Sequence, residues 1–206
     1  MSAHPLEEKR GRLPAAERRA AIVEAALQVF GARSYGRATT AEIARAAGVS
    51  EPILYRHFAS KRDLYVACLE AMGSRLRETV EEIITAEPDP REWSFAIPRA
   101  IDLLRKNGIY PSQMWIQALG EAGEDVELTR YLRWHMREMH SFAAGIIRRA
   151  QEAGGVALDR DPEAEAWIGL GLGLLRSVQA RLGGVLTAED FAAITRSRRL
   201  SLLPPG

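Results

Sequence analysis

The sequence predicts an all-α protein of about nine helices, with an N-terminal three-helix bundle followed by a larger C-terminal helical domain. Apolar residues recur at intervals of three and four through most of the chain, which is the spacing of one helical face. Capping residues, glycines and prolines divide this pattern into segments of helical length. No stretch alternates apolar and polar residues as a strand would. The 206 residues, 47% of them hydrophobic, can bury a substantial core.

The first helix is predicted to begin at Pro14, because proline suits a first turn whose amides lack partners within the helix. Residues at helical spacing form its apolar stripe, which consists of Ile22, Ala25, Ala26, Val29 and Phe30. Charged residues occupy the opposite face. This helix is the first of three in an N-terminal head.

Two short helices are predicted on either side of Gly48. Thr39, with Glu42 three residues later, has the spacing of a capping box and begins the first of them. Gly48 ends it, since the residue after a helix often adopts a positive φ that glycine tolerates. Ser50 is predicted to cap the second helix, with Pro52 in its first turn.

The second short helix has an apolar and a polar face. Leu54 and Phe58 lie four residues apart and are expected to face inward. This turns four side chains outward: Glu51, Pro52, Tyr55 and Arg56. Two helices joined by so tight a turn predict a helix-turn-helix whose second helix enters the major groove of DNA.

A longer helix is predicted from Ser60, which stands three residues before Asp63 as a cap, to about residue 86. Lys61 lies in its first turn, where a cation meets the positive end of the helix dipole. A DNA phosphate would supply the missing negative partner. Prolines near residue 90 stop this helix. Further helices are predicted at about residues 91–106, 111–122, 124–153, 161–182 and 187–199.

Several of these residues together resemble the DNA-binding signature of the TetR family of transcriptional regulators. The resemblance covers roughly residues 14 to 70 and rests on Thr40, Ile43, Ala44, Ala47-Gly48-Val49-Ser50, Leu54-Tyr55, His57-Phe58 and Lys61. It implies a DNA-binding domain at 14–60 and a ligand-binding and dimerisation domain at 61–206.

The resemblance also implies roles for individual residues in the head. Groups expected to position phosphates are Thr40, Ser50, Tyr55, His57 and Lys61. Groups expected to read bases are Glu51, Pro52, Ile53 and Arg56. The acid can accept from cytosine N4, and the arginine can bridge guanine O6 and N7. For His57 the alternative is a partly buried histidine with a local partner.

Charge supports a nucleic-acid partner only modestly. The net charge of +1 hides an asymmetry, because residues 1–65 carry a net +4 and the remainder −3. Residues 1–13 are polar, with Lys9, Arg10 and Arg12 among them. They are interpreted as a disordered terminus or as an arm that contacts DNA.

The larger domain contains aromatic and methionine side chains that suit either a core or a small-molecule site. The resemblance implies such a site between the helices of this domain, residues 61–206, which we call the body. Its expected lining is Trp93, Trp115, Gln117, Trp134, His135, Met139, Phe142 and Trp167. Plain core packing is the alternative interpretation for the aromatic and methionine residues among them.

Glycines within the predicted 161–182 helix indicate the close approach of another helix, since each costs about 1 kcal/mol relative to alanine. The resemblance implies that the last two helices, over residues 163–199, pair across a two-fold axis. The expected dimerisation residues are Gly169, Leu170, Gly173 and Leu174. Tight packing within one subunit is the alternative.

Enzymatic and membrane functions are disfavoured. His135 and His140 lie five residues apart, which is not the spacing of two metal ligands on one helical face. Cys68 is the only cysteine, so a small semi-buried residue is favoured over a redox sensor, and no multi-cysteine metal site can form. No apolar run reaches the ~20 residues that cross a bilayer. We therefore expect a cytoplasmic protein without metal or cofactor.

The sequence thus predicts a homodimeric repressor that binds a palindromic operator in double-stranded DNA and is released by a small, largely apolar effector. No residue distinguishes a repressor from an activator. The alternative is a ligand-binding or scaffolding protein of the same fold without specific DNA binding.

Overall fold

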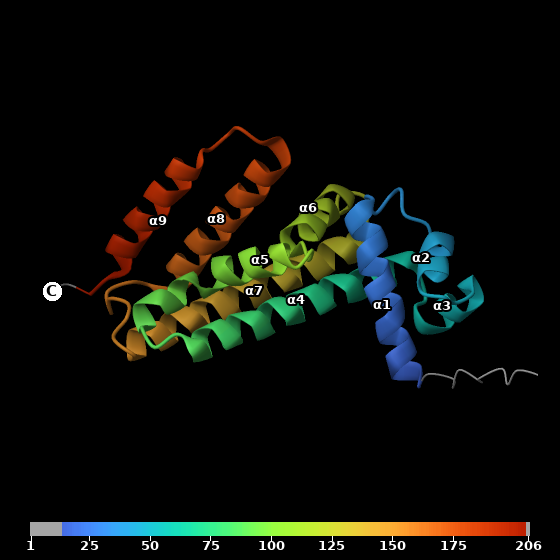
Figure 1. Ribbon diagram of the computed structural model, residues 1–206, viewed down its shortest axis with the longest axis horizontal. Coiled ribbons are helices and arrows are strands. Elements are labelled where there is room, and N and C mark those ends of the chain that lie inside the picture. The colour runs from blue at the N-terminus through green and yellow to red at the C-terminus, as the bar shows by residue number, and fades with distance from the viewer. Residues whose placement is uncertain (1–13, 205–206) are drawn as a thin grey trace, which may run out of the picture.

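A computed structural model describes residues 14–204, and in this part of the chain it contains nine α-helices and one 3-10 helix (Figure 1). The α-helices are α1 (Ala15–Ala32), α2 (Thr40–Ala46), α3 (Glu51–His57), α4 (Lys61–Ala86), α5 (Ala96–Lys106), α6 (Pro111–Glu121), α7 (Val126–Glu152), α8 (Pro162–Leu182) and α9 (Ala188–Leu202). The predicted all-α class and helix number are confirmed. The predicted N-terminal arm, residues 1–13, lies outside the described residues.

Local signals place the helix ends of the head. The Thr39 side chain accepts a hydrogen bond from the Glu42 amide, and the Glu42 carboxylate accepts one from the Thr39 amide, so the predicted capping box is present. Gly48 has the expected positive φ, at 64°. The Ser60 side chain accepts from the Asp63 amide and begins α4. These caps act over three residues, which makes them readable from sequence.

The predicted side-chain cap of α3 is wrong. Ser50 occupies the cap position but makes no side-chain capping bond. Pro52 has no amide hydrogen, and the Ile53 amide donates instead to the Ser50 carbonyl oxygen at 3.0 Å. Neither of the amides that a capping hydroxyl normally reaches is therefore free.

The helix predicted at 91–106 is divided. Residues Pro90–Phe95 form a 3-10 helix, and the α-helix α5 begins only at Ala96. Pro98 explains the late start, because a proline within a helix removes a backbone hydrogen bond and is tolerated only in the first turn. Beginning α5 at Ala96 places Pro98 in that first turn.

The core of the head continues into the body. The buried residues of α1 to α3 and those of α4 from Leu64 to Met72 share one apolar cluster with Met114 and Ala118 of α6 and with Leu128 of α7. The Tyr65 hydroxyl of α4 donates to the Met114 carbonyl oxygen at 2.8 Å within this cluster. α4 begins at Lys61, where the domain boundary was predicted, yet the packing does not stop there.

Cys68 also lies in this cluster and is fully buried. Burial raises the pKa of its thiol to about 12, so the side chain stays protonated near neutral pH. An inaccessible neutral thiol is unreactive, as the structural interpretation requires.

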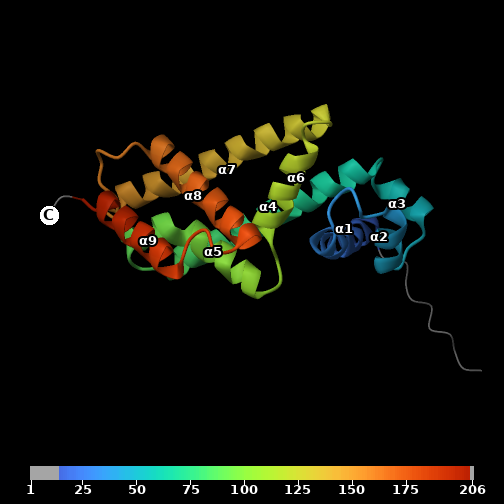
Figure 2. The ribbon, with the colours of Figure 1, turned by 90° about the horizontal axis from the view of Figure 1, so that it is seen from above.

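At the opposite end of the molecule, α8 and α9 form an antiparallel hairpin (Figures 1 and 2). Leu202 at the end of α9 is buried in a cluster with Ile147, and the Ala157 amide donates to its carbonyl oxygen at 2.9 Å. The buried carboxylate of Glu165 on α8 pairs with Arg198 on α9. These contacts hold the C-terminal end of α9. Within residues 14–204, no helix is both long and apolar enough to cross a membrane.

Candidate nucleic-acid interface and ligand site

α3 lies at the outer end of the head (Figure 1). Leu54 and Phe58 are buried in the core cluster of the head and anchor α3 there, with the Arg19 guanidinium of α1 4.7 Å from the centre of the Phe58 ring. This anchoring leaves the polar face of α3 accessible. Of the predicted DNA-contacting residues, Ser50, Pro52, Tyr55 and Arg56 are exposed, and Thr40, Glu51, Ile53, His57 and Lys61 are half-buried.

Three of these residues are joined by hydrogen bonds between α2 and α3. The Thr40 hydroxyl donates to the Glu51 carboxylate, with 2.7 Å between Oγ1 and Oε1. The Tyr55 hydroxyl lies 3.2 Å from the same Thr40 oxygen. Sequence reasoning gave these residues separate roles and missed their connection. The only signal was that Thr40 and Glu51 each begin a helix on either side of the turn.

Lys61 has a partner that the sequence did not reveal. Its ammonium nitrogen lies 4.5 Å from the centre of the Tyr35 ring, which itself packs against Tyr65. The negative face of an aromatic ring stabilises a cation. Burial lowers the pKa of Lys61, while the negative charge of Glu121 acts in the opposite direction. A phosphate is therefore not needed to explain a lysine at this helix start.

Four of the residues predicted to line a ligand site pack in different apolar clusters of the described structure. Met139 and Phe142 of α7 and Trp93 of the 3-10 helix pack in the apolar core of the body. Trp115 of α6 packs against the core of the head instead. For these four residues, the core interpretation describes their contacts.

The remaining predicted ligand residues have polar or exposed surroundings. The Gln117 side-chain oxygen is buried without a hydrogen-bond partner in the described part of the chain. His135 stacks on Tyr131, and burial followed by the charge of Arg77 lowers its pKa. Half-exposed side chains complete the set: Trp134 on α7, and Trp167 on α8, which stacks on His140.

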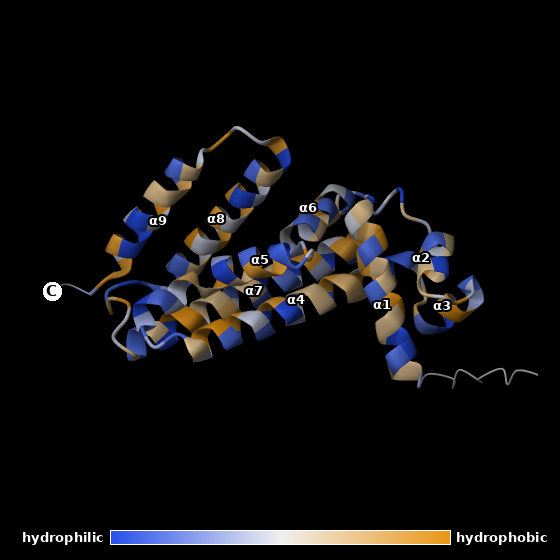
Figure 3. Cartoon of the chain, viewed as in Figure 1, coloured by the Kyte–Doolittle hydropathy of each residue, from blue (hydrophilic) through white to orange (hydrophobic). Residues whose placement is uncertain are grey.

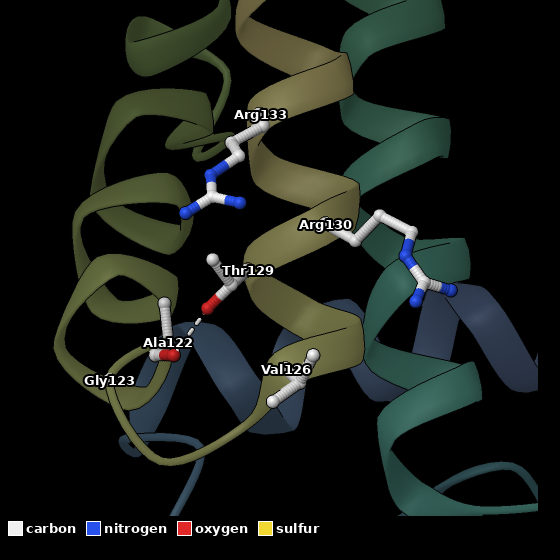
Figure 4. A pocket seen from close by; sticks show the side chains of 6 residues that line it. All are labelled: Ala122, Gly123, Val126, Thr129, Arg130 and Arg133. Carbon is white, nitrogen blue, oxygen red and sulfur yellow. Dashed lines mark hydrogen bonds between the residues drawn. The ribbon is translucent and has the colours of Figure 1, made fainter.

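Surface hollows of the described residues include two near the junction of head and body. The larger, about 480 Å³, lies at the α6–α7 turn (Figure 4) and is lined by Ala122, Gly123, Val126, Thr129, Arg130 and Arg133. The Arg133 side chain extends toward α6 in this view. The smaller, about 250 Å³, is lined by Arg19, Arg62, Asp63, Val66, Ala67, Glu70, Glu127 and Tyr131. Neither contains a predicted ligand residue, so that assignment stays a prediction.

The hairpin exposes the predicted dimerisation surface. Among residues 14–204, a methyl group added at Gly169 or Gly173 would meet no atom within 4 Å beyond the adjoining backbone of α8, so neither glycine packs tightly against another element there. Leu174 is partly exposed, whereas Leu170 is half-buried against the core of the body. Exposed apolar side chains accompany the glycines: Trp167, Ile168, Val178, Leu182 and Val185. Figure 3 shows hydrophobic and hydrophilic segments alternating along the ribbon of α8.

Among the residues that the structure describes, no three histidine, cysteine, aspartate or glutamate side chains gather in a way that could hold a metal ion.

Comparison with known proteins matches residues 22–68 to the family described as bacterial regulatory proteins, tetR family. The HTH-type transcriptional activator FasR of Mycolicibacterium smegmatis is 44% identical over 81 residues, which cover 39% of this chain and 37% of FasR. The HTH-type transcriptional regulator BetI of Rhizobium meliloti is 32% identical over 126 residues, covering 60% of this chain and 61% of BetI. These matches thus span less than two thirds of either relative.

The fold similarity extends over nearly the whole chain. The crystal structure of a TetR-family transcriptional regulator from Agrobacterium tumefaciens has a TM-score of 0.73 to it. The superposition covers 91% of this chain and 98% of that protein at 20% sequence identity. At this identity the likeness establishes the fold.

Proposed function

Because this chain belongs to the TetR family of transcriptional regulators, which are not enzymes, we propose that it is a sequence-specific DNA-binding regulator. It acts in the cytoplasm as a homodimer on a palindromic operator. One observation carries the proposal: α3 presents the side chains from Glu51 to Arg56, apart from buried Leu54, at an accessible end of the head. A helix presented in this way suits the major groove.

Dimerisation through α8 and α9 is part of the proposal. Open glycines next to exposed apolar side chains favour a surface that a second copy covers. A two-fold axis through this surface would place two heads on half-sites about 34–36 Å apart. The packing alternative for the glycines is disfavoured, because in the described part of the chain no atom beyond the adjoining backbone of the same helix lies within 4 Å of the added methyl groups.

The proposed regulation is relief of repression by a small, largely apolar effector bound between body helices. The coupling of effector and head is supported by contacts that connect α4 to α6 and to the segment before α7. The Tyr65 hydroxyl bonds to α6, and Arg62 pairs with Asp125 before α7, with 3.3 Å between Nη1 and Oδ1. A shift of α6 or α7 would therefore act on α4 and the head. Effector and operator binding would then be coupled reciprocally.

The test of DNA binding uses Arg56→Ala, with Arg137→Ala on α7 as a control in which an equally exposed arginine is lost far from the head. Operator duplexes are first selected from random DNA by the wild-type protein and then titrated with each variant. We expect Arg56→Ala to lose about 1–3 kcal/mol of binding free energy and to relax preference at one base per half-site. Arg137→Ala should bind like the wild type. Equal behaviour of the two variants would remove Arg56 from the interface.

The same selection separates the alternative function. A ligand-binding or scaffolding protein without specific DNA binding would enrich no sequence at moderate salt. The direction of regulation is tested by a reporter gene behind the selected operator. FasR is named as an activator, so expression that rises when this protein is produced would replace repression by activation.

A further inference from the structure

The hydrogen bonds joining Thr40, Glu51 and Tyr55 have a fixed direction. A threonine hydroxyl carries one proton, and an ionised carboxylate only accepts. At 2.7 Å from the Glu51 carboxylate, the Thr40 proton must point toward Glu51. The Tyr55 hydroxyl, 3.2 Å from the same Thr40 oxygen, must then be the donor to Thr40. The order of donation is Tyr55 to Thr40 to Glu51.

In this order the hydroxyl protons of Thr40 and Tyr55 are both donated within the protein. Both residues were predicted to donate these protons to DNA phosphates. A phosphate only accepts hydrogen bonds, so Thr40 could serve it only by turning its proton away from Glu51. The Glu51 carboxylate would then lose its donor next to a second negative charge. The resulting repulsion disfavours Thr40 as a phosphate contact.

The same bond restrains the Glu51 side chain. Its Oε1 atom is held by Thr40, and in the part of the chain that the structure describes this is the one hydrogen bond of the Glu51 side chain, which leaves Oε2 without a partner there. Glu51 is half-buried in the first turn of α3, which is the end of a recognition helix that approaches base edges. A carboxylate fixed by a charge-assisted hydrogen bond offers one acceptor in a defined direction.

We propose that Thr40 is a positioning residue for Glu51, which reads an amino group on a base edge through Oε2. The inference rests on the proposed function of sequence-specific DNA binding. In the major groove, cytosine N4 and adenine N6 are donors, whereas guanine O6 and N7 and thymine O4 are acceptors. The restrained carboxylate therefore favours cytosine or adenine at its position and rejects guanine and thymine. Thr40 acts on this preference only through Glu51.

The test compares Thr40→Val, which keeps the branched shape but removes the donor, with Thr40→Ser, which restores a hydroxyl. Glu51→Ala and the double variant complete a cycle that isolates the interaction between the two residues. The selected operator and duplexes that differ from it by one base pair are titrated with each protein, and random DNA serves as the reference. Circular dichroism melting verifies that each variant is folded.

We expect Glu51→Ala to abolish discrimination at one base pair per half-site. Thr40→Val should reduce discrimination at that same base pair about fivefold to tenfold, while affinity for random DNA stays unchanged. Thr40→Ser should restore it. The double variant should show the same discrimination as Glu51→Ala alone, because Thr40 has no separate base contact.

Two outcomes overturn the inference while leaving the proposed function intact. In one, Thr40→Val weakens binding to all duplexes equally and leaves base preference unchanged, as loss of a phosphate contact would. In the other, the effects of Thr40→Val and Glu51→Ala on discrimination are independent in the cycle. A wild-type protein that selects no sequence would instead overturn the proposed function, and the inference with it.

Discussion

The head buries its large apolar side chains, whereas the α8–α9 hairpin leaves several of its own exposed. In the head, Ile22, Phe30, Ile43 and Leu54 have no exposed surface. In the hairpin, Leu182 is 71% exposed although it belongs to an equally regular helix. Each region has a helix that begins with a complete capping box, α2 in the head and α9 in the hairpin. Local helix signals therefore do not explain the difference in exposure. The head completes its core within one chain, and the hairpin leaves an apolar face uncovered.

The difference in exposed apolar area corresponds to a difference in stabilising free energy. Burial stabilises by roughly 25 cal/mol for each Å² removed from water, and the head has already gained this stabilisation. On the hairpin the same gain remains available to a second copy of the chain. Four experiments sharpen or break this comparison.

The largest expected difference is between Leu54→Ala in the head and Leu182→Ala in the hairpin. Removing the buried Leu54 side chain should lower the free energy of unfolding by about 2–5 kcal/mol at every protein concentration. Leu182→Ala should stay within about 0.5 kcal/mol at low concentration and have a larger effect only where a dimer forms. Urea unfolding over a range of protein concentrations measures both. Equal, concentration-independent losses would contradict the comparison.

The second experiment fills an open glycine position. Gly169→Leu has room within the subunit, so the chain should fold, but it should block the close approach of a second copy. We expect a monomer in sedimentation and operator binding weakened by at least about a hundredfold, because two linked heads gain 10²–10⁴ over one. Gly120→Leu, at another open glycine on α6, is the control. A Gly169→Leu protein that remains dimeric would exclude this surface from the interface.

The third experiment compares the two capping boxes. Thr39→Ala in the head should lower global stability by about 1 kcal/mol, since α2 is part of a closed core. Thr187→Ala should instead fray the exposed start of α9, with faster hydrogen exchange near Asp190 and a global change below about 0.5 kcal/mol. Unfolding and amide exchange measure the two responses. If Thr187→Ala were the more damaging globally, the hairpin would be more strongly coupled to the core than its exposure indicates.

The smallest expected effect is on the pH dependence of the unfolding free energy, through His135 of α7. Burial, reinforced by Arg77, lowers the pKa of His135 in the folded protein, so the unfolded chain binds a proton more readily. The contribution of His135 is fully present above its ordinary pKa of about 6.5 and is lost as the pH falls below it. Unfolding free energies at about pH 5 and pH 7.5 should therefore differ less in His135→Gln than in the wild type. An unchanged difference would show that His135 does not contribute to acid sensitivity.

Much of the head was predictable because its signals are local. The Thr39–Glu42 cap, the positive φ of Gly48 and the inward positions of Leu54 and Phe58 each depend on residues within four positions. The predicted cap at Ser50 failed for a reason also present in the sequence, namely the missing amide of Pro52. The late start of α5 likewise follows from Pro98, which the periodicity alone did not reveal.

The candidate sites were less predictable because they depend on residues distant in sequence. Thr40 and Glu51 meet across the turn, and Lys61 meets Tyr35 from another segment, so helical spacing could not reveal either contact. For the body, the sequence supplied aromatic residues but not their neighbours. Trp115 joins the core of the head, and Trp167 reaches the outer surface.

The sequence by itself determined the all-α class, the helix-turn-helix and the helix boundaries set by caps, glycines and prolines, because these arise from backbone geometry over a few residues. Only the tertiary structure decided that α6 and α7 complete the core of the head, and that the glycines of α8 face open space. Apolar periodicity states which face of a helix avoids water. Which surface covers that face depends on how the whole chain packs.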